Sequence, residues 1–294
     1  MIERIVVPLD GSLSAEAILP QVRRVLHRND SEIILVRAVP QAEAPLGAAG
    51  EYLQGQKEKL ERAGARVKAL VRVGPPVDAI LGVVAQENGT MMALATHGAS
   101  GVSRLLLGSV AEEILRKSPV PVLAVRPFWC YEHLPPDGAE QRPLRNLLLP
   151  LDGSDRSESA LPGIIEFAGL FDLRVVLLRV LEGNRRRPAS AEDHAEAVKQ
   201  LKALAWTLER KGVEAVTLIE DGDPARRILD AIRLHGIDLI AMTTQGRSGV
   251  SRLVAGSVTE RVLRSATVPL LVSSSSGRSA AAGTLLAAGT QKKY

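Results

Sequence analysis

The sequence predicts an α/β protein built from two tandem open-sheet domains, each with five mostly parallel strands and helices on both faces in a Rossmann-like arrangement. Two observations lead to this prediction. Short apolar runs alternate with helical patterns along the chain, which favours parallel sheets. The same order of elements also occurs twice, since residues 5–12 (IVVPLDGS) recur as residues 147–154 (LLLPLDGS). A repeat of this length indicates one α/β unit present in two copies.

Within the first copy, hydrophobic periodicity assigns the elements in order. Ile18, Val22 and Val25 lie on the apolar side of the first helix. Pro20 and its counterpart Pro162 fall inside the first helix of each copy, where an offset or kink is expected because proline removes a backbone donor. The expected elements are strand 2–9, helix 14–27, strand 33–39, helix 51–63, strand 66–73, helix 76–88, strand 90–96, helix 109–117 and strand 121–126.

The second copy repeats this order with six additional residues. Its early motifs follow those of the first copy by 142 residues, whereas Gly98 recurs 148 residues later as Gly246. The additional residues therefore lie between about 182 and 222, in the connection after the second strand, because insertions belong in loops. The third helix of this copy is predicted to open at Asp223-Pro224, an N-cap followed by proline at the first helical position.

The repeat divides the chain into four segments. A stretch rich in proline and polar residues joins the copies, and the last segment is low in complexity and expected to be disordered. The predicted segments are a first domain at 1–127, a linker at 128–142, a second domain at 143–274 and a tail at 275–294.

The composition indicates a globular protein. The 294 residues have room for about two domains of roughly 100–200 residues each. Aromatic residues make up 3% of the chain, the net charge is +4, and the basic residues are scattered along the sequence. We therefore expect no surface that binds nucleic acid by stacking bases. Cys130 is a lone cysteine, which excludes an intramolecular disulfide and a cysteine-rich metal site.

No membrane or targeting segment is expected. No run of about 18 apolar residues occurs, so no transmembrane helix is predicted. The apolar positions from Ile2 to Leu9 read as a first strand without a cationic leader before it. Together with the cysteine content, these features predict a cytoplasmic protein without membrane contact.

Two nearly identical stretches follow the fourth strand of each copy. Residues 95–112 read ATHGASGVSRLLLGSVAE and residues 243–260 read TTQGRSGVSRLVAGSVTE. Each follows an apolar run and leads into a helical pattern, so each comprises a strand end, a glycine-rich loop and a helix start. Glycine lets a ligand approach the backbone closely, and a helix N-terminus favours an anion. The sequence therefore predicts two phosphate-binding loops.

An aspartate follows the first strand of each copy. Asp10 and Asp152 stand in Pro-Leu-Asp-Gly-Ser segments and are expected at the carboxyl edge of the sheet, where open α/β sheets bind ligands. Such a carboxylate can accept a hydrogen bond from a ribose hydroxyl or help to hold Mg²⁺. The alternative is a turn or N-cap residue, because Asp-Gly-Ser is common turn chemistry.

Ser109 and Ser257 start the helices after the loops and have two interpretations. Each stands three residues before a glutamate, Glu112 or Glu260, as in a capping box that needs no ligand. The alternative is that the hydroxyl and the neighbouring N–H groups bind a terminal phosphate. The two interpretations are compatible if the capping box forms in the empty loop and phosphate oxygens displace it when a ligand binds.

The sequence lacks sharper catalytic motifs. Neither glycine loop contains the lysine of a Walker-type NTPase, and no Gly-x-Gly-x-x-Gly occurs. His97 lies at the first loop, but Gln245 takes its place in the second, so a catalytic role shared by both copies cannot rest on it. Efficient enzymatic activity is therefore not predicted.

The combination of the Pro-x-Asp-Gly-Ser opening, the glycine loop and the Val-Pro strand that follows resembles the universal stress protein family. The resemblance covers roughly 1–126 and 143–274, with one family domain in each copy. Nucleotide-binding members carry Gly-x-x-Gly, nine residues and then Gly-Ser or Gly-Thr, and both copies match the later part. The first glycine of that motif is Ala95 in the first copy and Thr243 in the second.

The resemblance implies an adenine nucleotide alpha hydrolase-like fold with a site for ATP, alone or with Mg²⁺, in each copy. The aspartate would meet the ribose, the backbone at the end of the second strand would read the adenine edge, and the loop and first helical turn would line the triphosphate. The implied binding residues are Pro8, Asp10, Ala38, Ala95, Gly98, Gly101, Gly108, Ser109 and Val110 in the first copy, and Pro150, Asp152, Val180, Thr243, Gly246, Gly249, Gly256, Ser257 and Val258 in the second.

The resemblance also implies a non-enzymatic regulator of the stress response whose partner is an adenine nucleotide. Two alternatives stay open: a nucleotide-free protein-interaction module of the same fold, and a slow ATPase. Domains of the family pair through the last strand, so residues 121–126 and 267–272 are expected to pair within the chain. The result would be an internal pseudo-dimer that can associate further as a homodimer.

Overall fold

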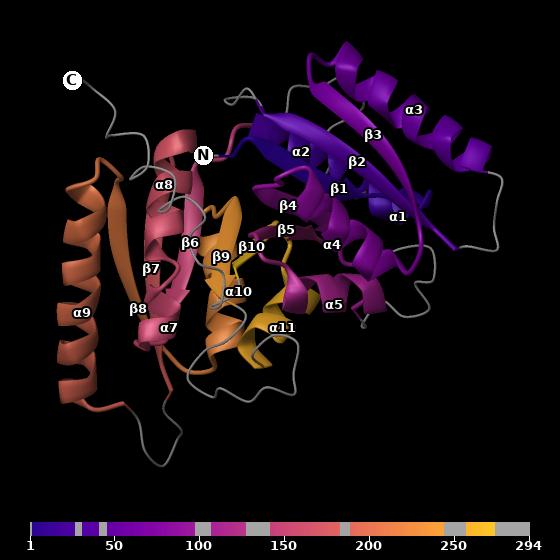
Figure 1. Ribbon diagram of the computed structural model, residues 1–294. Coiled ribbons are helices and arrows are strands. Elements are labelled where there is room, and N and C mark those ends of the chain that lie inside the picture. The colour runs from indigo at the N-terminus through magenta and orange to yellow at the C-terminus, as the bar shows by residue number, and fades with distance from the viewer. Residues whose placement is uncertain are drawn as a thin grey trace, which may run out of the picture.

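In the computed structural model, ten strands from the described parts of the chain form one sheet in the order β3-β2-β1-β4-β5-β10-β9-β6-β7-β8 (Figure 1). The structure describes residues 2–26, 31–40, 46–97, 107–127, 142–182, 189–243 and 257–273. The first half contains β1 (Arg4–Pro8), α1 (Leu13–Glu16), α2 (Leu19–Leu26), β2 (Glu32–Val39), α3 (Leu46–Arg62), β3 (Arg66–Val73), α4 (Pro76–Gln86), β4 (Met91–Ala95), α5 (Ser109–Lys117) and β5 (Val122–Val125). The second half contains β6 (Asn146–Leu151), α7 (Asp155–Glu158), α8 (Leu161–Phe171), β7 (Arg174–Leu181), α9 (Ala191–Glu209), β8 (Ala215–Asp221), α10 (Pro224–Leu234), β9 (Leu239–Thr243), α11 (Ser257–Ser265) and β10 (Leu270–Ser273).

The predicted alternation of strands and helices is confirmed. Strand β3 and helix α5 have the predicted bounds, and the other predicted strands of the first copy are found within one or two residues of their expected ends. Strand β10 begins three residues after the expected residue 267. Helix α3 begins at Leu46, before the predicted residue 51, because Gly47 and Gly50 weaken the helical signal in its first turn. The tail at 275–294 and all of the linker except Arg142 lie outside the described residues, so the domain boundaries stay a prediction.

The two halves join through β5 and β10. These strands pair antiparallel, with Leu123 opposite Leu271 and Ala124 opposite Leu270, whereas the other strand pairs are parallel. This pairing confirms the predicted internal pseudo-dimer. An unpaired strand edge would expose backbone N–H and C=O groups, and each half covers that edge of the other. The result is one continuous sheet rather than two separate ones.

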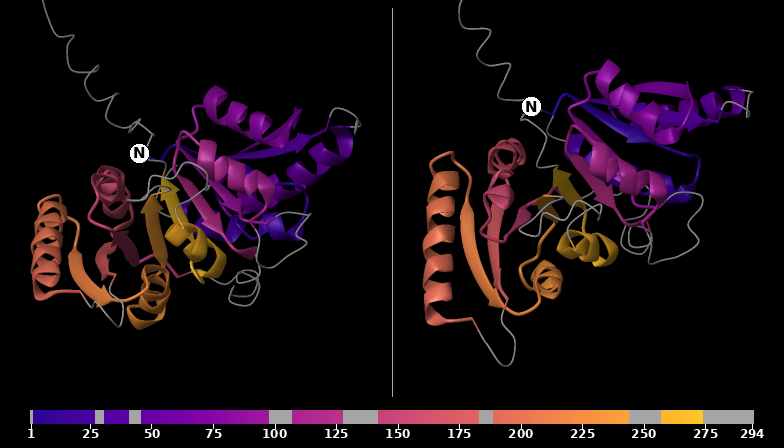
Figure 2. Two further views of the ribbon diagram at one scale, coloured as in Figure 1. Left: turned by 90° about the horizontal axis from the view of Figure 1, so that it is seen from below. Right: turned by 60° about the horizontal axis from the view of Figure 1, so that its bottom comes forward.

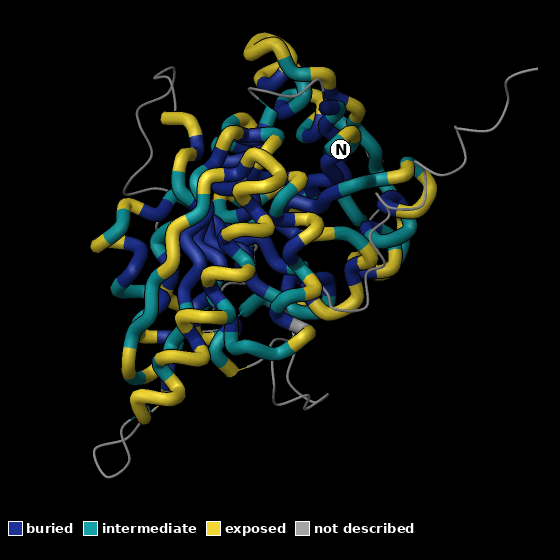
Figure 3. Tube along the Cα trace, turned by 90° about the vertical axis from the view of Figure 1, so that its left-hand side faces the viewer, coloured by how far each residue is buried: buried dark blue, intermediate teal, exposed yellow. Residues whose placement is uncertain are grey.

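Helices cover both faces of this sheet. Successive strand residues point to opposite faces, so Ile5 and Val7 belong to one buried cluster and Val6 to the other. Helices α2, α3, α8 and α9 pack on the first face, and α4, α5, α10 and α11 on the second (Figure 2). Figure 3 shows the buried strands running through the interior beneath more exposed helices.

The first helix of each half is divided in two at its proline. In the first half α1 ends at Glu16 and α2 begins at Leu19, so Pro20 stands in the first turn of α2. In the second half Pro162 occupies the first turn of α8. Proline fits a first turn because the N–H that it lacks has no intrahelical acceptor there. The expected offset is therefore a complete break between two short helices.

Arg24 of α2 connects the first half to the second. Its Nε donates to the carbonyl oxygen of Arg142 at 3.0 Å, and its Nη2 lies 3.7 Å from Oδ1 of Asp238. The other carboxylate oxygen of Asp238 accepts from the backbone N–H groups of Arg145 and Asn146, each at 3.0 Å. Burial lowers the pKa of Arg24, and the charge of Asp238 opposes that shift.

Helices α10 and α11 are linked by a bidentate ion pair. Asp223, the predicted N-cap of α10, accepts from Arg226 N at 2.9 Å. Its two oxygens also accept from Arg261 of α11, at 2.7 and 2.8 Å. The hydrogen bonds from Arg261, followed by the one from the Arg226 N–H, hold the pKa of Asp223 below its ordinary value.

None of the helices in the described ranges combines the length and the apolar composition that a bilayer crossing requires.

We predict that Asp223 stabilises the second half through both its cap and its charge. Asp223→Ala removes both and should lower the free energy of unfolding by about 1–2 kcal/mol. Asp223→Asn keeps a capping oxygen and should lower it by roughly 0.5 kcal/mol, since an exposed pair contributes little. Urea denaturation of both variants measures the difference, and equal losses would contradict a separate contribution of the cap.

The charge contribution should also depend on pH. Because the folded pKa of Asp223 is depressed, its stabilisation is present above the unfolded pKa and is lost as the pH falls through the folded pKa. The stability gap between wild type and Asp223→Asn should therefore narrow toward acid pH. A gap that stays constant down to strongly acid pH would argue against the ion pair.

Candidate functional site

Each half contains a point where the direction of the chain connections reverses. Strand β1 lies between β2 and β4, and β6 lies between β7 and β9. The chain therefore leaves the first strand of each half toward one side and later returns on the other. Connections that diverge in this way leave a crevice at the carboxyl ends of the strands, where open α/β sheets bind ligands.

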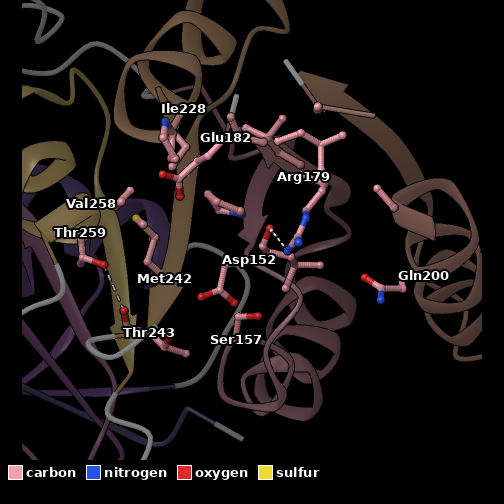
Figure 4. A pocket seen from close by; sticks show the side chains of 18 of the residues that line it. Asp152, Ser157, Arg179, Glu182, Gln200, Ile228, Met242, Thr243, Val258 and Thr259 are labelled. Carbon is pink, nitrogen blue, oxygen red and sulfur yellow. Dashed lines mark hydrogen bonds between the residues drawn. The ribbon is translucent and has the colours of Figure 1, made fainter. Parts of the chain in front are cut away.

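In the second half this crevice is a cavity of about 550 Å³. Its walls come from the ends of β6, β7 and β9 and from residues near the start of α9, α10 and α11. Figure 4 shows Asp152 and Arg179 near the middle of the view, Val258 and Thr259 of α11 on one side, and Gln200 of α9 on the other. The cavity thus extends from the central strands to the helices on both sides.

The cavity contains the predicted binding residues of the second half that the structure describes. They come from the ends of three strands and from the first turn of α11, which the sheet brings together although they span more than a hundred residues of sequence. The six residues are Pro150, Asp152, Val180, Thr243, Ser257 and Val258.

The equivalent positions of the first half are also at its carboxyl edge. Pro8 ends β1, Ala38 stands one residue before the end of β2, and Ala95 ends β4. Residues 108–110 form the start of α5. Asp10 follows β1, one residue beyond Leu9.

Five of the predicted binding residues belong to the glycine loops. Gly98, Gly101, Gly246, Gly249 and Gly256 lie outside the described residues.

Asp10 and Asp152 have the turn role that the sequence left open. Oδ1 of Asp152 accepts from the backbone N–H of Ser154 at 2.9 Å and from its hydroxyl at 2.6 Å, and the bonds from Ser12 to Asp10 have the same lengths. Ser154 and Ser12 in turn cap the short helices α7 and α1. Asp152 also lines the cavity, so capping and ligand contact do not exclude each other.

An arginine packs against the glycine after each aspartate. Gly153 has φ +74°, and a Cβ at this position would lie 2.6 Å from Nη1 of Arg179. The same nitrogen donates to the carbonyl oxygen of Leu151 at 3.4 Å. In the first half, a Cβ on Gly11 (φ +92°) would lie 3.1 Å from Nη1 of Arg37. The left-handed backbone favours glycine at both positions, and the guanidinium group occupies the space beside it.

The sequence analysis did not assign a role to Arg37 and Arg179. The signal was present, because both stand at the same place in the repeated second strand, IILVRA and VVLLRV. Their contact with Gly11 and Gly153 joins residues 26 positions apart, which no local pattern reveals.

Of the two interpretations of Ser109, the structure contradicts the capping box. The N-cap of α5 is Gly108, without a side-chain cap, and Ser109 is the first helical residue with an exposed side chain. The Gly108 N–H donates to the carbonyl oxygen of Thr96 at 2.8 Å, and a Cβ on Gly108 would approach that oxygen to 3.2 Å. Gly108 therefore takes the N-cap position, one residue before the serine that the capping box would need there. The Ser109 hydroxyl is consequently not used as a cap of α5.

The cavity has an acidic character. Among its described lining residues, four are carboxylates (Asp152, Glu182, Asp193 and Glu196) and one, Arg179, is a cation. Asp193 also forms a capping box with Ser190 at the start of α9. A polyanion would therefore depend on helix N–H groups and on an accompanying cation to offset the carboxylates. Within the described ranges, no group of three or more His, Cys, Asp or Glu side chains is arranged to hold a metal ion.

The corresponding region of the first half contains a tyrosine. Tyr52 of α3 donates from its hydroxyl to Oε1 of Glu16 at 2.9 Å, and the guanidinium carbon of Arg37 lies 5.2 Å from its ring centroid. Burial, followed by the bond to Glu16, raises the pKa of Tyr52 above its ordinary value, because both disfavour the phenolate. The sequence analysis did not consider Tyr52.

Comparison with known proteins assigns the same motifs to one family. The universal stress protein family model matches residues 1–126 and 143–274. A universal stress protein of Methanocaldococcus jannaschii is 34% identical over 140 residues, which cover 44% of this chain and 81% of the relative. One of Bacillus subtilis is 29% identical over 142 residues, covering 43% of this chain and 96% of the relative. Each of these relatives corresponds in length to one half.

The paired halves also have a counterpart among solved structures. The crystal structure of a universal stress protein from Archaeoglobus fulgidus has a TM-score of 0.71 and covers 94% of this chain and 99% of its own. At 22% sequence identity, this likeness shows the fold of both halves together.

We predict that Gly153 cannot be replaced without loss of stability. Gly153→Ala places a Cβ on a left-handed backbone (φ +74°) and should lower the free energy of unfolding by about 1–2 kcal/mol, because the Arg179 guanidinium can shift but the backbone cannot. Gly163→Ala is the matched control, since its Cβ would meet nothing within 4 Å in α8. It should raise stability by up to about 1 kcal/mol, because alanine favours helix. Urea denaturation measures both, and similar effects at the two sites would contradict the requirement for glycine at the left-handed position.

We also predict that Tyr52 ionises above the ordinary tyrosine pKa of about 10. The chain has three tyrosines, so the phenolate absorbance of wild type minus that of Tyr52→Phe isolates the titration of Tyr52. The expected midpoint is displaced upward, because burial and the Glu16 carboxylate both favour the neutral hydroxyl. A difference curve with an ordinary midpoint would contradict the buried contact.

Proposed function

Because this chain belongs to the universal stress protein family, we propose that it binds ATP in the cavity of its second half and acts as a non-enzymatic regulator of the stress response in the cytoplasm. The proposal rests on one observation above the others: the predicted binding residues that the structure describes in this half line one cavity. Its volume of about 550 Å³ lies within the range of roughly 300–1,000 Å³ that small-molecule sites occupy.

The order of the lining residues supports one orientation of the nucleotide. The backbone of Val180, at the end of β7, would contact the adenine edge, and the Asp152 carboxylate would accept from a ribose hydroxyl. The phosphates would then meet the first turn of α11 at Ser257 and Val258, whose N–H groups have no intrahelical acceptor. The positive end of the helix dipole favours such an anion.

The charge of the cavity supports Mg²⁺-ATP over free ATP as the ligand. Among the described lining residues, four carboxylates against Arg179 would repel an uncompensated triphosphate, and a divalent cation bound to the phosphates reduces that repulsion. The cation would therefore arrive with the nucleotide.

The lining chemistry supports binding over turnover. Phosphoryl transfer to water needs a positioned water and cationic groups on the transferred phosphate. Among the described residues of the cavity wall there is no lysine or histidine, and Arg179 lies against Gly153 beside the turn. ATP held in this way would act by occupancy, changing the surface that the protein presents.

A second candidate function is a protein-interaction module of the same fold without nucleotide. The observation that favours it is Thr243, which stands where nucleotide-binding members carry their first glycine and which lines the cavity. Its carbonyl oxygen accepts from the Thr259 hydroxyl at 3.1 Å, so strand end and helix α11 are already joined there.

The proposal predicts that Asp152 contributes to ATP affinity. Calorimetric titration with ATP and Mg²⁺ should show binding to wild type, and Asp152→Asn should weaken it about 10-fold, because the amide loses the charge-assisted bond to the ribose. Asp10→Asn, at the equivalent turn of the first half, is the matched control for effects on the fold. Asn keeps an oxygen for the serine bonds in both variants.

Three outcomes separate the candidate functions. Binding with negligible phosphate release supports the regulator, and rapid release identifies an ATPase. No heat of binding, together with no nucleotide in a mass spectrum of the denatured protein, overturns nucleotide binding and leaves the interaction module.

A further inference from the structure

The helix register identifies one position over the site at which the two halves carry side chains of different size and shape. Buried residues of α3 and α9 correspond at a separation of 148 positions, as Leu53 with Leu201 and Leu60 with Leu208 do. The same separation relates Tyr52 to Gln200. Gln200 lines the cavity of the second half, so Tyr52 occupies the equivalent place in the first half.

Tyr52 is held there from two sides. The guanidinium carbon of Arg37, near the end of β2, lies 5.2 Å from the centroid of the Tyr52 ring. Oε1 of Glu16 in α1 accepts a hydrogen bond from the Tyr52 hydroxyl at 2.9 Å. These three residues bridge a strand end and two helices at the carboxyl edge of the sheet. A half-buried aromatic ring with a cation over it and a carboxylate at its hydroxyl is well anchored.

Gln200 makes no such bridge. Its side-chain amide donates to Oε1 of Glu196 at 3.1 Å, one turn earlier in the same helix. The carboxylate and guanidinium positions are retained in the second half as Glu158 and Arg179, so among the three residues of this bridge only the side chain at position 52 or 200 differs. Where the first half has an aromatic ring, the second has part of a cavity.

The ring stands beside the place that the base would need. Arg37 directly precedes Ala38, the counterpart of Val180, whose backbone would contact the adenine edge. The contacts of Tyr52 with Arg37 and Glu16 keep the ring on the side of this place that Gln200 lines in the second half.

We propose that Tyr52 closes the first half to nucleotide and that the chain binds one ATP, in the second half. This inference rests on the proposed function, and it names the residue that makes the two repeated halves differ in nucleotide binding. The first half would then serve as a permanently closed partner across the β5–β10 pair.

The test is the stoichiometry of Mg²⁺-ATP binding in the full chain, measured by calorimetry. Wild type should bind one equivalent. Gln200→Tyr should lose at least 10-fold in affinity, and Tyr52→Gln should gain a second equivalent. Tyr52→Phe keeps the ring and should remain at one equivalent. Circular dichroism and thermal unfolding of each variant check the fold, and Gln200→Tyr tests the inference even if Tyr52→Gln does not fold.

The outcomes distinguish the inference from the function on which it rests. Two equivalents in wild type, or one equivalent that survives Gln200→Tyr with unchanged affinity, would overturn the inference and leave ATP binding in place. No binding to wild type would overturn the proposed site in the second half. In that case one equivalent gained by Tyr52→Gln would still support closure by the ring, and none would overturn it.

Discussion

The candidate site depends on the reversal of chain connections beside β6. From β6 the chain passes to β7 on one side, while β9 lies on the other and receives its connection from the far edge of the sheet. The gap between the diverging connections stays open at the carboxyl ends, and the N-terminal turns of α10 and α11 face it. Every functional argument made for Asp152, Val180 and Val258 follows from this geometry, because the three residues have no sequence proximity and meet only at that edge.

The antiparallel pair of β5 and β10 explains why the two halves are free to differ. Each half buries its open sheet edge against the other, so the join between the halves does not involve the ligand-binding residues at the carboxyl edges. The differences are specific. Asp223 caps α10 and binds Arg261, whereas Pro75 at the start of α4 has no side-chain cap. At the start of β6, the Asp238 carboxylate accepts a hydrogen bond from the backbone N–H of Asn146. At the start of β1, the Thr90 hydroxyl accepts the corresponding bond from Arg4 N–H. A shared scaffold therefore supports two unequal carboxyl edges.

The sequence predictions succeeded where a single local rule governs and failed where two segments compete. Strand and helix order followed from periodicity, and Asp223-Pro224 was recognised as a helix start because cap and proline chemistry are local. The Ser109 capping box failed because Gly108, which approaches the Thr96 carbonyl closely, takes the N-cap position. For Pro20 the sequence predicted an offset or kink but not two separate helices, because the hydrophobic pattern does not distinguish the two.

Whereas the pairing of the last strands was implied only by the resemblance to the family, the sequence by itself determined the repeated α/β unit and the types of residue at the carboxyl edges. Each of these is recorded in period, spacing or motif, which are properties of neighbouring residues. Only the tertiary structure decided that six of the predicted binding residues share a cavity, that Arg37 and Arg179 pack on the glycines of the turns, and that Tyr52 stands where Gln200 leaves space. Those contacts join side chains from different strands and helices, and their geometry is set by how the helices pack on the sheet rather than by any local pattern.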